Sequence, residues 1–161
     1  MEIERKFTIK KLPKDLGSYE SKKMIQAYLS REPVVRVRRS NDKYYMTYKG
    51  SGLIAREEYN LPLTKESFEH LLAKADGNVI SKTRYLIPLK EPKFRDGYEY
   101  SGVMLTIELD VFDAPMAPLV MAEIEFPDME SAEAYIPEDW FLEDVSEDPR
   151  YHNVNMAYGD V

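Results

Sequence analysis

The chain repeatedly places charged residues two positions apart on segments whose other positions are largely apolar. The first six residues open this pattern, with Glu2, Glu4 and Lys6 alternating with Ile3 and Arg5. Because successive side chains of a strand point to opposite faces, each such segment forms a strand with one charged face. The same spacing returns in Arg36 with Arg38, Arg56 with Glu58, Lys82 with Arg84, Glu108 with Asp110, and Glu123 with Glu125. The pattern predicts a protein made mainly of strands.

Turn residues separate these segments into about eight strands, which are mostly sequential and antiparallel. The predicted strands are residues 2–9, 24–30, 34–39, 43–49, 55–61, 79–89, 103–112 and 119–126. Such an order favours a closed barrel or a sandwich over a doubly wound sheet. The predicted class is therefore α+β, with an antiparallel barrel and flanking helices.

Fewer segments carry a helical pattern. Thr64 has the position of an N-cap, and Phe68, Leu71, Leu72 and Ala75 follow at helical spacing, with Gly77 just past the expected end. A short helix is expected within residues 11–21, after Pro13, and another over residues 129–135. Residues 90–101 are expected to form an exposed hairpin loop, and residues 137–161 a tail that packs on the barrel or closes it.

The charged faces have two interpretations. Each could be a solvated outer face, because ordinary sheets with one wet side alternate in the same way. However, these faces consist almost wholly of like-charged pairs, which repel unless a counter-charge lies between them. A bound polyphosphate would supply it for the basic pairs. Divalent cations would supply it for the acidic pairs.

Composition narrows the classes of function. The chain has 161 residues, enough for one domain over 1–161, and its formal net charge of −7 argues against non-specific binding to DNA, RNA or anionic membranes. There is no cysteine and there are two histidines, so a metal would have carboxylate ligands, which favours Mg²⁺ or Mn²⁺. No membrane-spanning run or signal peptide is recognised, and a cytoplasmic location is expected.

The ordered set of charged segments resembles the CYTH superfamily, also called triphosphate tunnel metalloenzymes. Glu2, Glu4 and Lys6 match the hallmark Glu-x-Glu-x-Lys, and the ending Glu-Asp-Pro-Arg-Tyr-His-Asn-Val-Asn-Met-Ala from Glu147 is similar to the short bacterial members. The further matching positions are Arg36, Arg38, Lys49, Lys82, Arg84, Glu108, Asp110, Glu123 and Glu125. The resemblance implies an eight-stranded antiparallel barrel that forms a tunnel, and metal-dependent hydrolysis of a triphosphate.

By the same resemblance, each charged residue has an expected role. Phosphates would be held by Lys6, Arg36, Arg38, Lys49, Lys82 and Arg84, with Arg56 as a further contact whose strand register is ambiguous. Divalent ions would be held by Glu2, Glu4, Asp110, Glu123 and Glu125, with Glu108 and Glu58 as second choices. Glu4, Lys82 and Tyr28 are the predicted catalytic residues. Tyr28 would be a proton acceptor, and a packing role is its alternative, because tyrosine is a poor base at neutral pH.

The resemblance to short members favours an inorganic triphosphatase that converts tripolyphosphate into diphosphate and phosphate with Mg²⁺ or Mn²⁺. Hydrolysis of a nucleoside, thiamine or RNA 5′-triphosphate remains an alternative, as does a class IV adenylate cyclase. A non-catalytic polyphosphate-binding barrel and a plain structural barrel are the non-enzymatic alternatives. The expected partner is a small triphosphate, without DNA or membrane, and a homodimer stays open.

Overall fold

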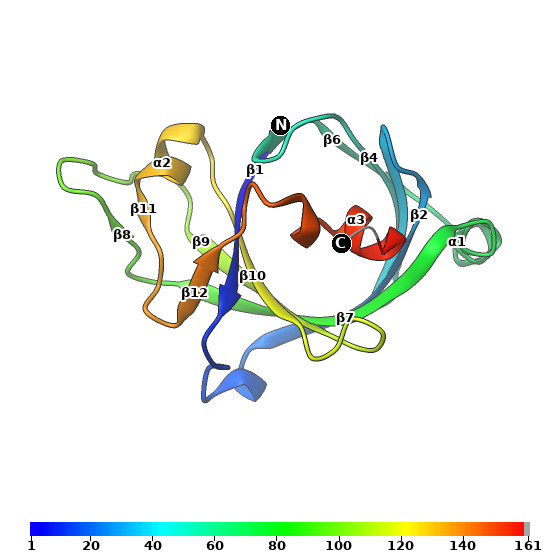
Figure 1. Ribbon diagram of the computed structural model, residues 1–161, viewed down its shortest axis with the longest axis horizontal. Coiled ribbons are helices and arrows are strands. Elements are labelled where there is room, and N and C mark those ends of the chain that lie inside the picture. The colour runs from blue at the N-terminus through cyan, green and yellow to red at the C-terminus, as the bar shows by residue number, and fades with distance from the viewer. Residues whose placement is uncertain (160–161) are drawn as a thin grey trace.

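Antiparallel strands account for most of the secondary structure in the computed structural model, which describes residues 1–159 (Figure 1). The hydrogen-bonded order runs through β1 (Glu2–Ile9), β10 (Val120–Glu125), β9 (Leu105–Phe112), β7 (Asp76–Leu89), β2 (Glu20–Ser30), β3 (Val34–Ser40), β4 (Lys43–Lys49) and β6 (Glu58–Pro62). The short strand β5 (Ala55–Arg56) pairs with β1 and brings this order back to its beginning. Together the strands form a barrel.

The barrel closes through a strand that changes its partner. β6 pairs with β4, whereas β5 pairs with β1 through Glu2 opposite Arg56 and Ile3 opposite Ala55. The single strand predicted over residues 55–61 is therefore interrupted at Glu57, where the chain leaves one neighbour and joins the other. With β5 and β6 counted as the two halves of one strand, the predicted eight-stranded antiparallel barrel is confirmed.

The apolar faces of one side of the barrel point outward and form the larger hydrophobic core. Phe7, Ile107, Leu109 and Ile124, from β1, β9 and β10, are buried there. Covering them are α2 (Met129–Ala134), β12 (Phe141–Asp144) and the pair β8 (Lys93–Phe94) with β11 (Tyr135–Ile136). Figure 1 shows these elements grouped on one side of the ring. The charged faces of the same strands consequently point inward.

Three local predictions differ from the structure. Residues 90–101 do not pair as a hairpin of their own, because β8 pairs with β11 far along the chain. The helix that Thr64 caps, α1 (Lys65–Leu72), ends before Gly77, which instead lies in β7 with a φ of +66°. A Cβ at Gly77 would come within 2.6 Å of the Ala157 carbonyl oxygen, so this glycine permits close approach of the C-terminal segment. In residues 11–21 the helix is one 3₁₀ turn, η1 (Leu16–Ser18).

The C-terminal segment follows the outside of the barrel and then covers one end of it. β12 pairs with β1, and the chain continues through the 3₁₀ helix η2 (Pro149–Tyr151) to α3 (Asn153–Tyr158). Met156 and Ala157 of α3 pack with Tyr28, Ile80 and Phe112 at the end of the barrel interior, and α3 lies within the outline of the ring in Figure 1. Asp160 and Val161, the last part of the predicted tail, lie outside the described residues. Within residues 1–159, no helix has the length and apolarity needed to cross a membrane.

Candidate functional site

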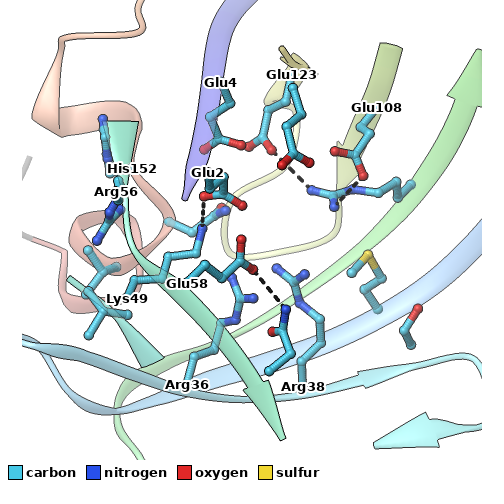
Figure 2. A pocket seen from close by; sticks show the side chains of 18 of the residues that line it. Glu2, Glu4, Arg36, Arg38, Lys49, Arg56, Glu58, Glu108, Glu123 and His152 are labelled. Atoms are coloured by element: carbon cyan, nitrogen blue, oxygen red, sulfur yellow. Dashed lines mark hydrogen bonds and ion pairs between the residues drawn. The ribbon is translucent and has the colours of Figure 1, made fainter. Parts of the chain in front are cut away.

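A cavity of about 370 Å³ occupies the barrel interior (Figure 2). Twelve of the predicted site residues line it: Glu2, Glu4, Lys6, Tyr28, Arg36, Arg38, Lys49, Arg56, Arg84, Glu108, Glu123 and Glu125. Two others, Lys82 and Asp110, are completely buried behind it and are not among the lining residues. The interpretation of the charged faces as solvated outer surfaces is therefore wrong.

Three neighbouring strands bring the glutamates together. Glu4 of β1 lies opposite Glu125 of β10, and Glu123 of β10 lies opposite Glu108 of β9. Figure 2 shows Glu4, Glu123 and Glu108 side by side along one side of the cavity. We call this set the acidic wall: Glu2, Glu4, Glu108, Glu123 and Glu125.

Four of the five glutamates of the acidic wall have raised pKa values, although Lys6, Lys49 and Arg84 form ion pairs with some of them. Burial and the charge of Glu123 raise the pKa of Glu4, and burial also raises the pKa of Glu108. The pKa values of Glu2 and Glu125 are raised as well, chiefly by burial. Glu123 differs: although its burial acts in the opposite direction, Lys6 and Arg84 hold the pKa of this carboxyl well below its usual range. A cation would relieve the repulsion among the other glutamates.

Arg84 on β7 is surrounded by carboxylates. Its Nε donates to Oδ1 of Asp110 at 2.7 Å and its Nη1 to Oε2 of Glu108 at 2.9 Å, while Nη2 reaches Asp110 at 2.9 Å and Glu123 at 3.4 Å. Asp110 also accepts from Nζ of Lys82 at 2.7 Å. Despite its burial, Arg84 has a pKa raised well above the usual value by Asp110 and Glu108. Both Asp110 oxygens are thus occupied by cations of the barrel itself.

Lys82 lies deeper still, because it is completely buried beside Asp110. Burial lowers its pKa to about 7 although the Asp110 charge acts in the opposite direction, and the nearby Arg84 and Arg38 add to the lowering.

Arg36 and Arg38 on β3, which we call the basic wall, lie across the cavity in Figure 2 and have a different environment. Within residues 1–159 neither forms an ion pair: Arg38 donates to Gln26 at 2.7 Å and to the Tyr45 hydroxyl at 3.4 Å, and Arg36 donates to Thr47 at 3.3 Å. Burial and the neighbouring Arg36 and Arg84 lower the pKa of Arg38. Among the described residues, the basic wall therefore has no carboxylate within ion-pair distance, although the charge of Glu58 interacts with that of Arg36.

The buried atoms without a hydrogen-bond partner point the same way. In the described part of the chain these side-chain atoms are Nε of Arg36 and Nε2 of Gln26. Both are donors, and they belong to neighbouring strands, since Gln26 lies opposite Arg38 across the pairing of β2 with β3. Because buried donors are costly when unpaired, these two atoms show that donors exceed acceptors on this side of the barrel interior.

A third group joins the two walls. Nζ of Lys49 pairs with Oε1 of Glu2 at 2.8 Å, and Arg56, opposite Glu2 on β5, donates to the Gly50 carbonyl oxygen at 3.2 Å. The structure thus settles the register of Arg56 and places it on the cavity. Glu58, the second-choice ligand, also lines the cavity, and its pKa is lowered because its contacts with Glu2 and Lys49 outweigh its burial.

Sequence reasoning missed several residues near the site. Gln26 and Asn60 share a strand face with Tyr28 and Glu58, so the period of two could have found them. For His152 the sequence favours a structural role, with contact at the tunnel mouth as the alternative. The structure brings it to the cavity from the C-terminal segment, where no periodic signal could have placed it. It is buried, its Nε2 lies 3.3 Å from the Ser146 carbonyl oxygen, and burial together with Lys6 lowers its pKa to about 4.

The donor chemistry of the acidic wall suits a hard divalent cation, which prefers oxygen ligands. However, no group of three or more acidic or histidine side chains within residues 1–159 is already arranged as a metal site. Several carboxylates are instead paired with internal cations, as Glu2 is with Lys49. A cation would have to draw the glutamates away from these partners.

A closed barrel whose interior sets unpaired arginines against buried glutamates defines a class of protein that holds a polyanion with its cations inside a tunnel. The comparisons with known proteins agree. The family model of the CYTH domain matches residues 1–152, and the chain belongs to this family. CYTH triphosphate tunnel enzymes are metal-dependent, as the resemblance implies.

Two curated relatives cover nearly the whole chain. The inorganic triphosphatase of Nitrosomonas europaea is 35% identical over 159 residues, which are 97% of this chain and 96% of the relative. The inorganic triphosphatase of Acetivibrio thermocellus is 35% identical over 162 residues, covering 97% of this chain and 92% of the relative. A crystal structure of an inorganic triphosphatase is also similar, with a TM-score of 0.69, 32% identity and coverage of 98% of this chain and 95% of the other.

Proposed function

We propose that this chain hydrolyses inorganic triphosphate to diphosphate and phosphate in the barrel cavity, with Mg²⁺ or Mn²⁺ as the metal. One observation carries the proposal: arginines without an anionic partner face glutamates whose pKa values are raised. Triphosphate and a divalent cation together supply both missing charges. Relatives of similar length named inorganic triphosphatase support the same substrate.

The basic wall is where the phosphate chain would bind. Guanidinium groups match phosphate oxygens with paired donors, and ammonium groups add point charge. The lysines and arginines that line the cavity are Lys6, Lys22, Arg36, Arg38, Lys49, Arg56 and Arg84. Lys82, predicted to contact phosphate, lies behind this surface, and we propose that it acts through Asp110 and Arg84.

The acidic wall is where the metal would bind. Glu2, Glu4, Glu108 and Glu125 have raised pKa values and line the cavity, and Glu123 lies between them. Asp110, predicted to be a ligand, is occupied by Lys82 and Arg84, and we propose instead that it holds Arg84 in place. When bound, the ion would neutralise the triphosphate and make the attacking water more acidic.

The reaction needs attack of water on a terminal phosphorus and departure of diphosphate as the bridging P–O bond breaks. Cations on the cavity surface stabilise the negative charge that spreads over the phosphate oxygens, which is the main task in phosphoryl transfer. We propose Glu4 as the group that receives the water proton, because its carboxylate lines the cavity and its pKa is raised. Tyr28, buried where α3 packs, would then be a wall of the cavity.

The lining of the cavity favours an inorganic substrate over a nucleotide. Aromatic side chains among the lining residues are Tyr28 and Tyr45, and the Tyr45 hydroxyl already accepts from Arg38. In the described residues the cavity therefore offers charge along its walls rather than an apolar slot for a base or a thiazolium ring. We also propose a cytoplasmic location and a small-molecule partner, without DNA or membrane partners.

The test is phosphate release from tripolyphosphate, ATP and thiamine triphosphate, each with Mg²⁺, Mn²⁺ or EDTA. We expect rapid release from tripolyphosphate, its loss in EDTA and little release from the other two. Preference for ATP or thiamine triphosphate would reassign the substrate, and cyclic AMP would then be sought among the products. Tight binding of tripolyphosphate without turnover would leave a polyphosphate-binding barrel.

A further inference from the structure

Gln26 is an interior residue that the proposed function leaves unexplained. It lies on β2, directly opposite Arg38, and it is completely buried. Its Oε1 accepts from Nε of Arg38 at 2.7 Å, and its Nε2 has no partner among the described residues. The orientation of the amide follows from its neighbour, because a guanidinium only donates and must therefore face the oxygen.

Asp110 makes the corresponding contact for Arg84. In both cases a buried acceptor on an adjacent strand receives the Nε of an inward-pointing arginine at 2.7 Å. The two acceptors differ in charge. Asp110 is an anion and, with Glu108, neutralises Arg84, whereas the Gln26 amide orients Arg38 without neutralising it.

We propose that Gln26 is a positioning residue, which fixes Arg38 by its Nε while leaving the positive charge of the guanidinium for the phosphate chain. This inference rests on the proposed function, because it assumes that Arg38 binds phosphate. A glutamate at position 26 would have a side chain of the same length and would offer an oxygen acceptor at the same place. It would also pair with Arg38 and remove the charge that makes the basic wall attract anions.

The unpaired Nε2 supports this assignment. A carboxylate at position 26 would leave no unpaired donor, whereas the amide leaves one in a fully buried place. Buried donors without a partner are disfavoured, so their presence needs a reason. The reason we infer is that Arg38 requires a neutral acceptor beside it.

The test uses Gln26→Glu, Gln26→Met, Arg38→Gln and the double variant Gln26→Glu/Arg38→Gln. Tripolyphosphate binding is measured by calorimetry in EDTA, and KM and kcat are measured with Mg²⁺. We expect Gln26→Glu to raise Kd and KM by about tenfold or more, the effect of losing one charge-assisted interaction, with kcat changed by less than about threefold. Its thermal midpoint without ligand should equal or exceed that of the wild type.

Gln26→Met keeps the length and removes the acceptor, so Arg38 keeps its charge but loses its orientation. We expect a smaller rise in KM, about threefold to tenfold. In the Arg38→Gln background, Gln26→Glu should have almost no further effect on Kd, since neighbouring residues that act through one contact are not additive.

Several results would overturn the inference. It fails if Gln26→Glu and Gln26→Met both bind tripolyphosphate as the wild type does, or if Gln26→Glu weakens binding equally with and without Arg38. If Gln26→Glu does not fold, Gln26→Met alone decides by its Kd. A wild type that binds tripolyphosphate without hydrolysing it would remove the proposed function, and the binding cycle would still test the role of Gln26.

Discussion

Arg84 and Arg38 place the same guanidinium group in the same barrel under opposite electrostatic conditions. Arg84 contacts three carboxylates, whereas Arg38 contacts an amide and a hydroxyl. A buried cation with its anions present contributes to holding the fold, and removal of one partner leaves an uncompensated charge. A buried cation without an anion costs stability and attracts a ligand. The comparison indicates that Arg84 stabilises the barrel, whereas Arg38 is available to bind a substrate.

The largest expected effect is on stability, from Arg84→Gln. Asp110, Glu108 and Glu123 would lose their shared cation in a buried place. We expect the free energy of unfolding to fall by about 3–5 kcal/mol in urea titrations. Arg38→Gln is the matched control on the other wall and should not destabilise the protein. Equal losses of unfolding free energy in Arg84→Gln and Arg38→Gln would show that the carboxylates around Arg84 do not stabilise the fold.

Glu4→Gln should affect turnover more than the fold. Because the pKa of Glu4 is raised in the folded protein, its ionised form opposes folding above that pKa, and an amide should leave stability unchanged or higher. We expect kcat for tripolyphosphate to fall about 100-fold or more, as when one transition-state stabiliser is removed. Glu57→Gln, at an exposed position, is the control and should keep wild-type kcat. Unchanged turnover in Glu4→Gln would remove the acidic wall from the reaction.

Arg38→Gln should change substrate affinity without a loss of stability. Removal of an unpaired buried cation relieves its repulsion with Arg36, so we expect an equal or higher unfolding free energy. The KM for tripolyphosphate should rise about tenfold or more, the size of a charge-assisted hydrogen bond. Steady-state kinetics and urea unfolding of the same preparation would measure both quantities. If Arg38→Gln had the KM of the wild type, Arg38 would not contact the phosphates.

The smallest expected effect is the contribution of His152 to acid sensitivity. Burial is the main reason that its pKa is about 4 in the folded protein, below the ordinary value of 6.5. Lys6 and Arg56 also oppose its protonation, whereas the contact with Ser146 and the charge of Glu123 favour it. Between these two pKa values the unfolded chain binds the extra proton, so stability falls as the pH is lowered through this window. From pH 7 to 5.5 the loss should be about 1 kcal/mol.

Unfolding free energies of the wild type and His152→Gln at pH 7 and 5.5 would measure this contribution. The variant should lose less stability on acidification than the wild type does. Identical losses would show that His152 does not titrate as its environment indicates.

The alternation of residues predicted most of the strands. Residues 2–9 and 43–49 form strands with the expected bounds, and Thr64 caps a helix as its hydroxyl and the following pattern indicate. Most of the charged residues selected from these strands line one cavity, since a period of two fixes which side chains share a face. The resemblance to the CYTH family is confirmed, since the family model matches residues 1–152.

The remaining features depended on contacts between residues far apart in the sequence. Glu108 and Asp110 lie two positions apart on one strand, and the sequence assigns them to the same face. In the structure Glu108 lines the cavity, whereas Asp110 lies behind it with Lys82. Gln26 became part of the site only through its contact with Arg38, and Gly77 became a packing position because α3 lies against it. Both roles depend on residues far away in the sequence. A helix end was therefore predicted at Gly77, where the structure has a strand.

The sequence by itself determined the alternating strands, the set of charged side chains on each face and the kind of ligand that such charges attract. Only the tertiary structure decided that these faces point into the barrel, which arginine meets a carboxylate and which meets an amide. The physical reason is that alternation is a property of each strand's own backbone geometry. The pairing of charges depends on register and curvature, which exist only once the barrel is closed.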